Sequence, residues 1–309
     1  MKKCMKPDSD TNQKVNDAKQ EFKDNKKVKL EVVTNIVSEE ECRLQNHEII
    51  DKYKSSVENC SLKIEDDESV TSLKFVDCIS IYELTVMKCQ NVKFTDIPLQ
   101  VKTLCVYDSE IDCKGLDQMK QLTDLCIENN LVFNIQDLKF NQLTQLTYLM
   151  LSQCNIKTVK QLKVLKNLEY LNLSSNKIQK INGMEFLIHL YHLDLSKNQI
   201  KNIDCLKVLV NLSKLKLESN QIKSLNKLQN LTNLLFLNAD CNQIKTLEPL
   251  KNLKQLIELS VNNNQLQNLE AIEYLFTLQV FNAQYNNIKD FSPLKYHFHK
   301  EEYNLDPQK

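Results

Sequence analysis

Glycine is nearly absent from this chain of 309 residues, which has only two, Gly115 and Gly183, and tryptophan is missing altogether. Phosphate-binding loops need several glycines at fixed spacing, because the backbone must approach the phosphate closely. Neither GxGxxG nor GxxxxGK(S/T) can be assembled from the two glycines present. The scarcity therefore argues against nucleotide binding of the common kinds.

Long apolar runs and an excess of one charge are also missing. No stretch of about 18 apolar residues occurs, and the first residues, Met1–Asp8, lack the apolar core of a signal peptide. The 40 basic and 40 acidic residues cancel, so no whole-chain field attracts nucleic acid or an acidic membrane. We expect no membrane span, no membrane partner and no nucleic-acid partner.

The 11 cysteines are odd in number and form no CxxC pair. Secreted disulfide frameworks have even, clustered cysteines, whereas cytosolic thiols stay reduced. We therefore expect reduced cysteines and a location in the cytoplasm or the nucleus.

Leucine, in contrast, recurs with a strict 22-residue period. It stands at Leu146, Leu168, Leu190, Leu212, Leu234, Leu256 and Leu278. Each unit reads LxxLxLxxNxIxx(I/L)xxLxxLx, and a fixed period of this length indicates a stacked repeat. The alternating LxL core predicts a short strand with its leucines pointing inward and the residue between them outward.

An asparagine follows each strand core, at the point where the chain turns away. The positions are Asn176, Asn198, Asn220, Asn242, Asn264 and Asn286, with Cys154 in the first regular unit. An amide both donates and accepts, so we expect these side chains to satisfy buried main-chain groups along the stack. Cys154 is interpreted as structural.

The sequences NKIQKI, from residue 176, and NQIKSL, from residue 220, resemble the leucine-rich repeats of the protein phosphatase 1 regulatory subunit and axonemal dynein light chain 1. The resemblance covers roughly residues 122–294, and the irregular opening is similar to repeat proteins of diplomonad protists. It implies the α/β class: a leucine-rich-repeat solenoid (horseshoe) with a parallel concave sheet and short 3-10 or irregular convex segments. We expect an N-terminal helical cap as well.

The changing pattern predicts five segments along the chain. They are a mobile polar arm at 1–37, a capping helix at 38–60, degenerate irregular repeats at 61–121, regular repeats at 122–294 and a polar tail without a further repeat at 295–309. In the irregular part, strand cores are expected at 62–64, 73–75, 84–86, 104–106 and 125–127. The first three of these cores follow one another in 11-residue steps.

Outward positions on the strands should line the concave face, the usual binding face of solenoids. The predicted partner-binding residues are Tyr148, Met150, Tyr170, His192, Asp194, Lys214, Lys216, Phe236 and Asn238. The tyrosines and Phe236 are expected to be exposed and to serve as interface anchors. The mixed charges around Asp194 and Lys216 are expected to be solvated, because surface ion pairs contribute only about 0–1 kcal/mol.

Other chemistry is poorly supported. A row of lysines at the twelfth position of the units is interrupted by Gln179 and Gln267 and has no interleaved aromatics, so it does not indicate nucleic-acid binding. His192 and Asp194 lie near serines, but an open sheet offers no enclosed pocket or oxyanion donors. His297 and His299 lack further placed metal ligands. We expect no enzyme activity, no cofactor and no metal.

The predicted function is therefore a monomeric, non-catalytic scaffold that binds an unidentified protein partner on its concave face. The resemblance leaves a regulatory subunit of a protein phosphatase 1-type phosphatase as the alternative, with the catalytic subunit as partner. The chain departs from that family in having few concave acids, and Asn91-Val92-Lys93-Phe94 lacks the basic residue of the docking motif. A surface adhesin like the bacterial internalins is a third hypothesis, which requires export.

Overall fold

The computed structural model describes residues 29–34, 60–65, 81–88, 92–93, 97, 99–109, 111–130, 135–297 and 302–307. They belong to two compact units, Met1–Leu146 and Thr147–Lys309. Within the described residues, no helix is both long and apolar enough to cross a membrane.

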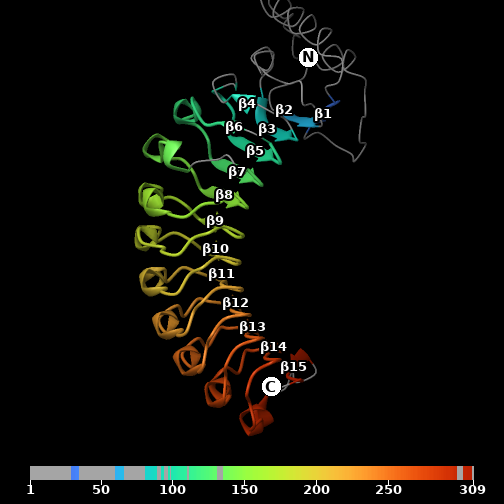
Figure 1. The fold of residues 1–309 in the computed structure, drawn as a ribbon, viewed down its shortest axis with the longest axis vertical. Helices are drawn as coiled ribbons and strands as arrows, with labels where there is room; N and C mark the ends of the chain where they lie inside the picture. The colour runs from blue at the N-terminus through green and yellow to red at the C-terminus, as the bar shows by residue number, and fades with distance from the viewer. Residues whose placement is uncertain are drawn as a thin grey trace, which may run out of the picture. The chain divides into compact units, whose positions relative to one another are not determined.

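The second unit is a stack of short parallel strands. They are β8 (Tyr148–Ser152), β9 (Tyr170–Asn172), β10 (His192–Asp194), β11 (Lys214–Lys216), β12 (Phe236–Asn238), β13 (Glu258–Ser260), β14 (Val280–Asn282) and β15 (Tyr303–Asn304). Neighbouring strands pair in parallel, with each residue opposite the equivalent position of the next repeat. The strands line the inner side of the curved stack (Figure 1). The parallel concave sheet is confirmed.

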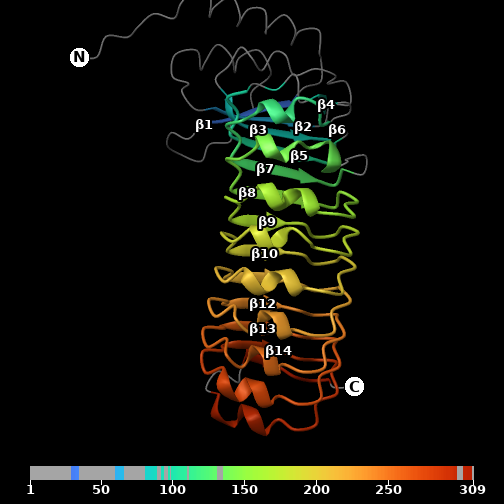
Figure 2. The same cartoon turned by 90° about the vertical axis from the view of Figure 1, so that its left-hand side faces the viewer.

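Short 3-10 helices form the convex side of this unit (Figure 2). They are η6 (Lys160–Val164), η7 (Met184–Phe186), η8 (Asp204–Val208), η9 (Asn226–Leu228), η10 (Glu248–Leu250), η11 (Glu270–Tyr274) and η12 (Ser292–Tyr296). Each of the first five buries a single apolar side chain, such as Leu206 in η8. A segment with so little apolar surface is held by its contacts with neighbouring repeats, so the helices stay at one turn or little more.

The core lies between the strands and the 3-10 helices. Leu168, Leu171 and Leu173 of one unit are 0% exposed, and the equivalent residues of the next units are buried in the same way. A fully buried leucine contributes about 2 kcal/mol relative to an exposed one. The stacked leucines are therefore the main stabilising feature of the unit.

The predicted role of the asparagines is confirmed. The Nδ2 of Asn198 lies within hydrogen-bond distance of the carbonyls of Leu173 (2.9 Å), Leu195 (3.1 Å) and Ser196 (3.1 Å). Its Oδ1 accepts a hydrogen bond from the N–H of Ile178 at 3.0 Å. The other five asparagines make the same contacts with the equivalent main-chain groups around their own repeats.

Cys154 takes part in this row as a structural residue, as predicted. Its N–H donates to Asn176 Oδ1 at 3.0 Å, and its thiol donates to the carbonyl of Ser152 at 3.1 Å. The side chain is fully buried.

The first unit contains longer and less regular strands. They are β1 (Lys29–Thr34), β2 (Cys60–Glu65), β3 (Ile81–Met87), β5 (Thr103–Tyr107) and β7 (Asp124–Glu128), in that spatial order. β1 is antiparallel to β2, and the other pairs are parallel. β4 (Val92–Lys93) and β6 (Ile111–Asp112) form a separate two-stranded sheet, and the 3-10 helices are η3 (Leu116–Gln118), η4 (Ile135–Asp137) and η5 (Phe140–Gln142).

The expectation of two short steps at the start of the irregular part is wrong. β2 pairs directly with β3, and Leu62 is opposite Leu84, so one full-length step replaces the two short ones. The following steps, to Leu104 and Leu125, are nearly as long as a regular repeat. An 11-residue step is too short for geometric reasons, because each strand must be followed by a return segment long enough to reach the start of the next strand. The expected core at 73–75 lies outside the described residues.

The two ends of the chain also differ from the expected pattern. Residues 29–34 of the expected arm form β1, and residues 303–304 of the expected tail form β15, in which Tyr303 is opposite Phe281. The repeat thus extends beyond residue 294. The capping helix at 38–60 lies outside the described residues except for Cys60, so the five-segment division of the chain stays a prediction.

Candidate interaction surface

The sheet places the nine predicted residues in two rows across the concave face of the second unit. The third position of each repeat contributes Tyr148, Tyr170, His192, Lys214 and Phe236, which are opposite one another in the register. The fifth position contributes Met150, Asp194, Lys216 and Asn238, and Asn172, which is not among the nine, lies between Met150 and Asp194. Adjacent strands lie about 4.8 Å apart, so side chains in a row touch their neighbours. The structure therefore brings all nine residues onto one continuous surface.

Three rings in the third-position row lie against one another. Tyr148 and Tyr170 lie face to face, with centroids 4.1 Å apart and planes 6° apart, and His192 follows at 4.3 Å from Tyr170 and 49°. The two tyrosine rings cover each other's faces, whereas the His192 ring is tilted against Tyr170. The prediction of exposed aromatics is wrong in this respect, because Tyr148, Tyr170 and Phe236 are all half-buried. Their edges form the accessible part of the row.

His192 ends the stack with an unsatisfied nitrogen. Its Nε2 is enclosed and has no hydrogen-bond partner among the described residues. Burial lowers the pKa of His192, and the positive charge of Lys214 lowers it further, while Asp194 acts in the opposite direction. The imidazole is therefore neutral at neutral pH, so it can serve as a hydrogen-bonding group rather than as a charge.

Asp194 is not the solvated charge that the sequence suggested. It is only 6% exposed, and its Oδ1 accepts hydrogen bonds from the N–H (2.9 Å) and the hydroxyl (2.6 Å) of Ser196. Its Oδ2 lies 3.6 Å from the Nζ of Lys216. These contacts fix the carboxylate and, with it, the position of Lys216.

Lys214 lies next to the aromatic row. Its Nζ is 5.8 Å from the ring centroid of Phe236, within the range of a cation–π contact. The row thus changes from aromatic to cationic and back to aromatic between β9 and β12.

Two acidic residues stand at the seventh position of their units. Sequence reasoning missed Asp240 and considered Glu218 only as part of a solvated charged patch with Asp194, Lys197, Lys214 and Lys216. Glu218 Oε2 accepts a hydrogen bond from Asn238 Nδ2 at 2.6 Å, and Asp240 Oδ1 accepts from Ser260 Oγ at 2.8 Å and Asn262 N at 2.6 Å. Continuing the alternation one outward position further would have found them. They add a carboxylate-rich margin to the predicted surface.

The other candidate chemistries do not assemble. The hydroxyl of Ser196 donates to Asp194 rather than to His192, so no serine–histidine relay forms. His297 is buried, with Nε2 2.9 Å from the Ile272 carbonyl and Nδ1 2.8 Å from the Tyr303 hydroxyl. His299 lies outside the described residues, within which no group of three or more His, Cys, Asp or Glu residues could hold a metal ion.

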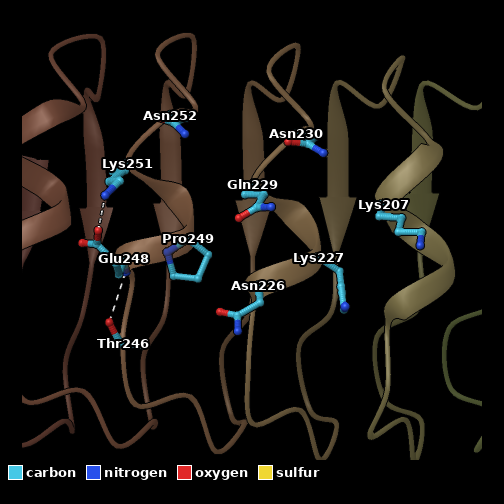
Figure 3. A pocket seen from close by; sticks show the side chains of 10 residues that line it. All are labelled: Lys207, Asn226, Lys227, Gln229, Asn230, Thr246, Glu248, Pro249, Lys251 and Asn252. Atoms are coloured by element: carbon cyan, nitrogen blue, oxygen red, sulfur yellow. Dashed lines mark hydrogen bonds and ion pairs between the residues drawn. The ribbon is translucent and has the colours of Figure 1, made fainter.

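A hollow on the convex side has no convergent polar groups. It is lined by Lys207, Asn226, Lys227, Gln229, Asn230, Thr246, Glu248, Pro249, Lys251 and Asn252 (Figure 3). Lys251 pairs with Glu248, whose N–H donates to the hydroxyl of Thr246 at 3.1 Å. The remaining side chains are spread along the surface, so the hollow does not define a ligand site.

Comparison with known proteins agrees with this architecture. The family model described as Leucine Rich repeats (2 copies) matches residues 144–189. Internalin C2 of Listeria monocytogenes is 30% identical with a TM-score of 0.56, over 62% of this chain and 82% of its own. A leucine-rich-repeat protein of Leptospira interrogans is 24% identical with a TM-score of 0.60, over 76% and 62%.

A third solved structure is internalin F of Listeria monocytogenes. It is 22% identical with a TM-score of 0.59, over 82% of this chain and 87% of its own. No curated protein matches the sequence. The leucine-rich-repeat fold generally mediates protein–protein interaction without catalysing a reaction. The repeated units, the parallel sheet and these similarities show that the chain belongs to the leucine-rich-repeat proteins.

Proposed function

We propose that the concave surface from β8 to β12 binds a partner protein, and that the nine predicted residues, which are all of its third- and fifth-position residues except Asn172, make the contact. The observation that carries the proposal is the stack of Tyr148, Tyr170 and His192 beside Lys214. Rigid, half-buried aromatic edges next to a charge lose little side-chain entropy on binding, which is the usual property of interface anchors.

The chemistry of the surface suggests the kind of segment that it binds. An apolar or aromatic side chain would lie over the ring edges of the stack, where Met150 lines the next row. A carboxylate would face Lys214, since Lys216 is already paired with Asp194. The partner would thus present an aromatic or aliphatic group followed by an acid.

The double variant Tyr170→Ala/Phe236→Ala tests this proposal. We expect it to abolish recovery of a specific partner from native lysate, identified by mass spectrometry, and to weaken its binding as a purified protein at least tenfold. The thermal unfolding curve should stay close to that of the wild type. The matched control is Tyr274→Ala/Phe276→Ala, two exposed aromatics outside the nine-residue surface. Equal loss in both variants, or no loss in the first, would contradict the proposal.

A phosphatase regulatory subunit is the second candidate. The resemblance implies acidic and aromatic contacts on the concave face, and Phe236 and the carboxylates of Glu218 and Asp240 provide some of them. This function requires co-purification with a phosphatase catalytic subunit at near-equal stoichiometry. Absence of that subunit from the complex at low salt would remove the candidate.

The location separates the scaffold from an adhesin. We propose the cytoplasm or the nucleus, on the basis of the odd number of cysteines, whereas the similarity to internalin C2 favours the adhesin hypothesis. Immunostaining of intact and permeabilised cells distinguishes the two. Staining that requires permeabilisation supports the scaffold, and staining of intact cells supports the adhesin.

A further inference from the structure

Two cysteines face each other across neighbouring strands of the first unit. Cys105 in β5 and Cys126 in β7 are direct partners in the parallel register. Leu104 and Leu125, one residue earlier, are 0% exposed in the core, so the cysteines lie on the opposite face of the sheet. Paired strands are about 4.8 Å apart, and a disulfide needs Cα atoms about 4.4–6.8 Å apart. The separation of the two strands therefore falls within the range of Cα distances that a disulfide requires.

The two thiols differ in their surroundings. Cys105 is half-buried, whereas Cys126 is 7% exposed. A hydrogen bond from the Cys126 thiol lowers the pKa of Cys105 to about 7, helped by the Tyr107 hydroxyl and opposed by burial, Glu83 and Asp124. The same hydrogen bond and burial raise the pKa of Cys126. One thiol is thus substantially ionised near neutral pH, while the other keeps its proton.

The other cysteines whose side chains the structure describes lack this arrangement. Cys113 and Cys154 are buried. The thiol of Cys205 donates to the Ile181 carbonyl at 3.3 Å, and burial raises its pKa to about 12. Cys241 is exposed and lies on a turn of the second unit, which makes it a useful internal reference.

We propose that Cys105 and Cys126 form a site of stoichiometric oxidation by small hydroperoxides. The Cys105 thiolate attacks the terminal peroxide oxygen, and the O–O bond breaks. The departing alkoxide takes a proton from solvent, which leaves Cys105 as a sulfenic acid. The Cys126 thiol then attacks that sulfur, and the hydroxyl group leaves with the thiol proton as water. In total, two thiols and one hydroperoxide give one disulfide, one alcohol and one water.

The test uses the full chain, reduced and freed of reductant, with one equivalent of hydrogen peroxide at pH 7. We expect a product lighter by two hydrogen atoms, with a disulfide between Cys105 and Cys126. Cys113 shares a tryptic peptide with Cys105, so fragment ions must assign the linked sulfur. A disulfide that involves another cysteine, or oxidation without a disulfide, would overturn the proposal.

The order of attack has its own test in two variants. Cys126→Ser should accumulate a sulfenic acid on Cys105 that dimedone traps, whereas Cys105→Ser should give no adduct on Cys126. In the wild type we expect Cys105 to react about tenfold faster at pH 7 than the exposed Cys241, because thiolate is the reactive form. Equal rates at the two cysteines would contradict the assignment.

Tyr107 is a positioning residue in this site. Tyr107→Phe removes the hydroxyl that stabilises the thiolate of Cys105. We expect the midpoint of the pH profile for Cys105 alkylation to move upward while the circular dichroism spectrum is unchanged. An unchanged midpoint would show that the hydroxyl has no such role.

Discussion

At the scale of the residue, single polar side chains decide whether the turns of the stack can be buried. Each asparagine that follows a strand core forms hydrogen bonds with main-chain groups of its own repeat and of the preceding one. Asn220, for example, contacts the carbonyls of Leu195, Leu217 and Glu218 and the N–H of Ile200. An unpaired buried polar group costs about 1–3 kcal/mol. These positions therefore tolerate few substitutions.

Asn220→Ala tests this role. It leaves several buried main-chain groups without partners, so we expect the free energy of unfolding to fall by about 2–4 kcal/mol. Urea denaturation followed by circular dichroism measures the change. Asn226→Ala, at an exposed position in η9, is the matched control and should change stability by less than about 0.5 kcal/mol. Similar losses in both variants would contradict the role of the asparagine.

His192 should make stability depend on pH. Its pKa is lowered in the folded chain by burial and Lys214, so the unfolded chain binds the proton more tightly. The stabilisation that the neutral His192 gives to the folded chain is present above the ordinary histidine pKa of about 6.5. It is lost as the pH falls through that value toward the lower pKa of the folded chain.

His192→Gln should therefore reduce the loss of stability between pH 7.5 and pH 5. Thermal unfolding at a series of pH values measures it, with the exposed His189→Gln as the control histidine. If the melting temperature of His192→Gln changes with pH as steeply as that of the wild type, the imidazole of His192 does not titrate as described.

At the scale of the element, regular leucines made the strands of the second unit predictable. The LxL cores mark β8 to β11, because leucine fills both inward positions there. In the units of β12 and β13, Ala239 and Val261 replace the second leucine, and the first leucine and the following asparagine keep the pattern recognisable. β15 was missed because Tyr303 takes the inward position, where its hydroxyl lies 3.0 Å from the Leu278 carbonyl and 2.8 Å from His297. In the first unit, the expectation of 11-residue steps was wrong because β2 pairs directly with β3.

The candidate surface was predictable in part for the same reason. Alternation assigns each outward residue to a row, which placed all nine on one face. It does not state how neighbouring side chains meet across strands. The stacking of Tyr148 on Tyr170 and the burial of Asp194 depend on those contacts, so the predicted exposures were wrong.

Gly183 shows why one of the two glycines is needed. It precedes η7 with φ +99°, and a Cβ there would lie 3.0 Å from the carbonyl oxygen of Lys160. Gly183→Ala should lower the free energy of unfolding by about 2 kcal/mol through backbone strain and this close contact. Chemical denaturation of this variant and of the exposed neighbour Asn182→Ala gives the comparison. A neutral effect of Gly183→Ala would contradict the requirement for glycine.

At the scale of the whole molecule, the repeats separate stability from recognition. Inward leucines and asparagines make each repeat depend on its neighbours, so stability is collective within a unit. Outward residues can change without altering that core, which is why the fold does not identify the partner. The central claim is that recognition belongs to the concave rows of the second unit.

Photocrosslinking tests this claim most directly. A benzophenone amino acid is placed at Asn238, on the concave surface, and in a second variant at Lys227, which lines the convex hollow (Figure 3). We expect the purified partner to be crosslinked from position 238 and not from position 227. Crosslinking from position 227 alone, or equally from both positions, would contradict a concave binding face.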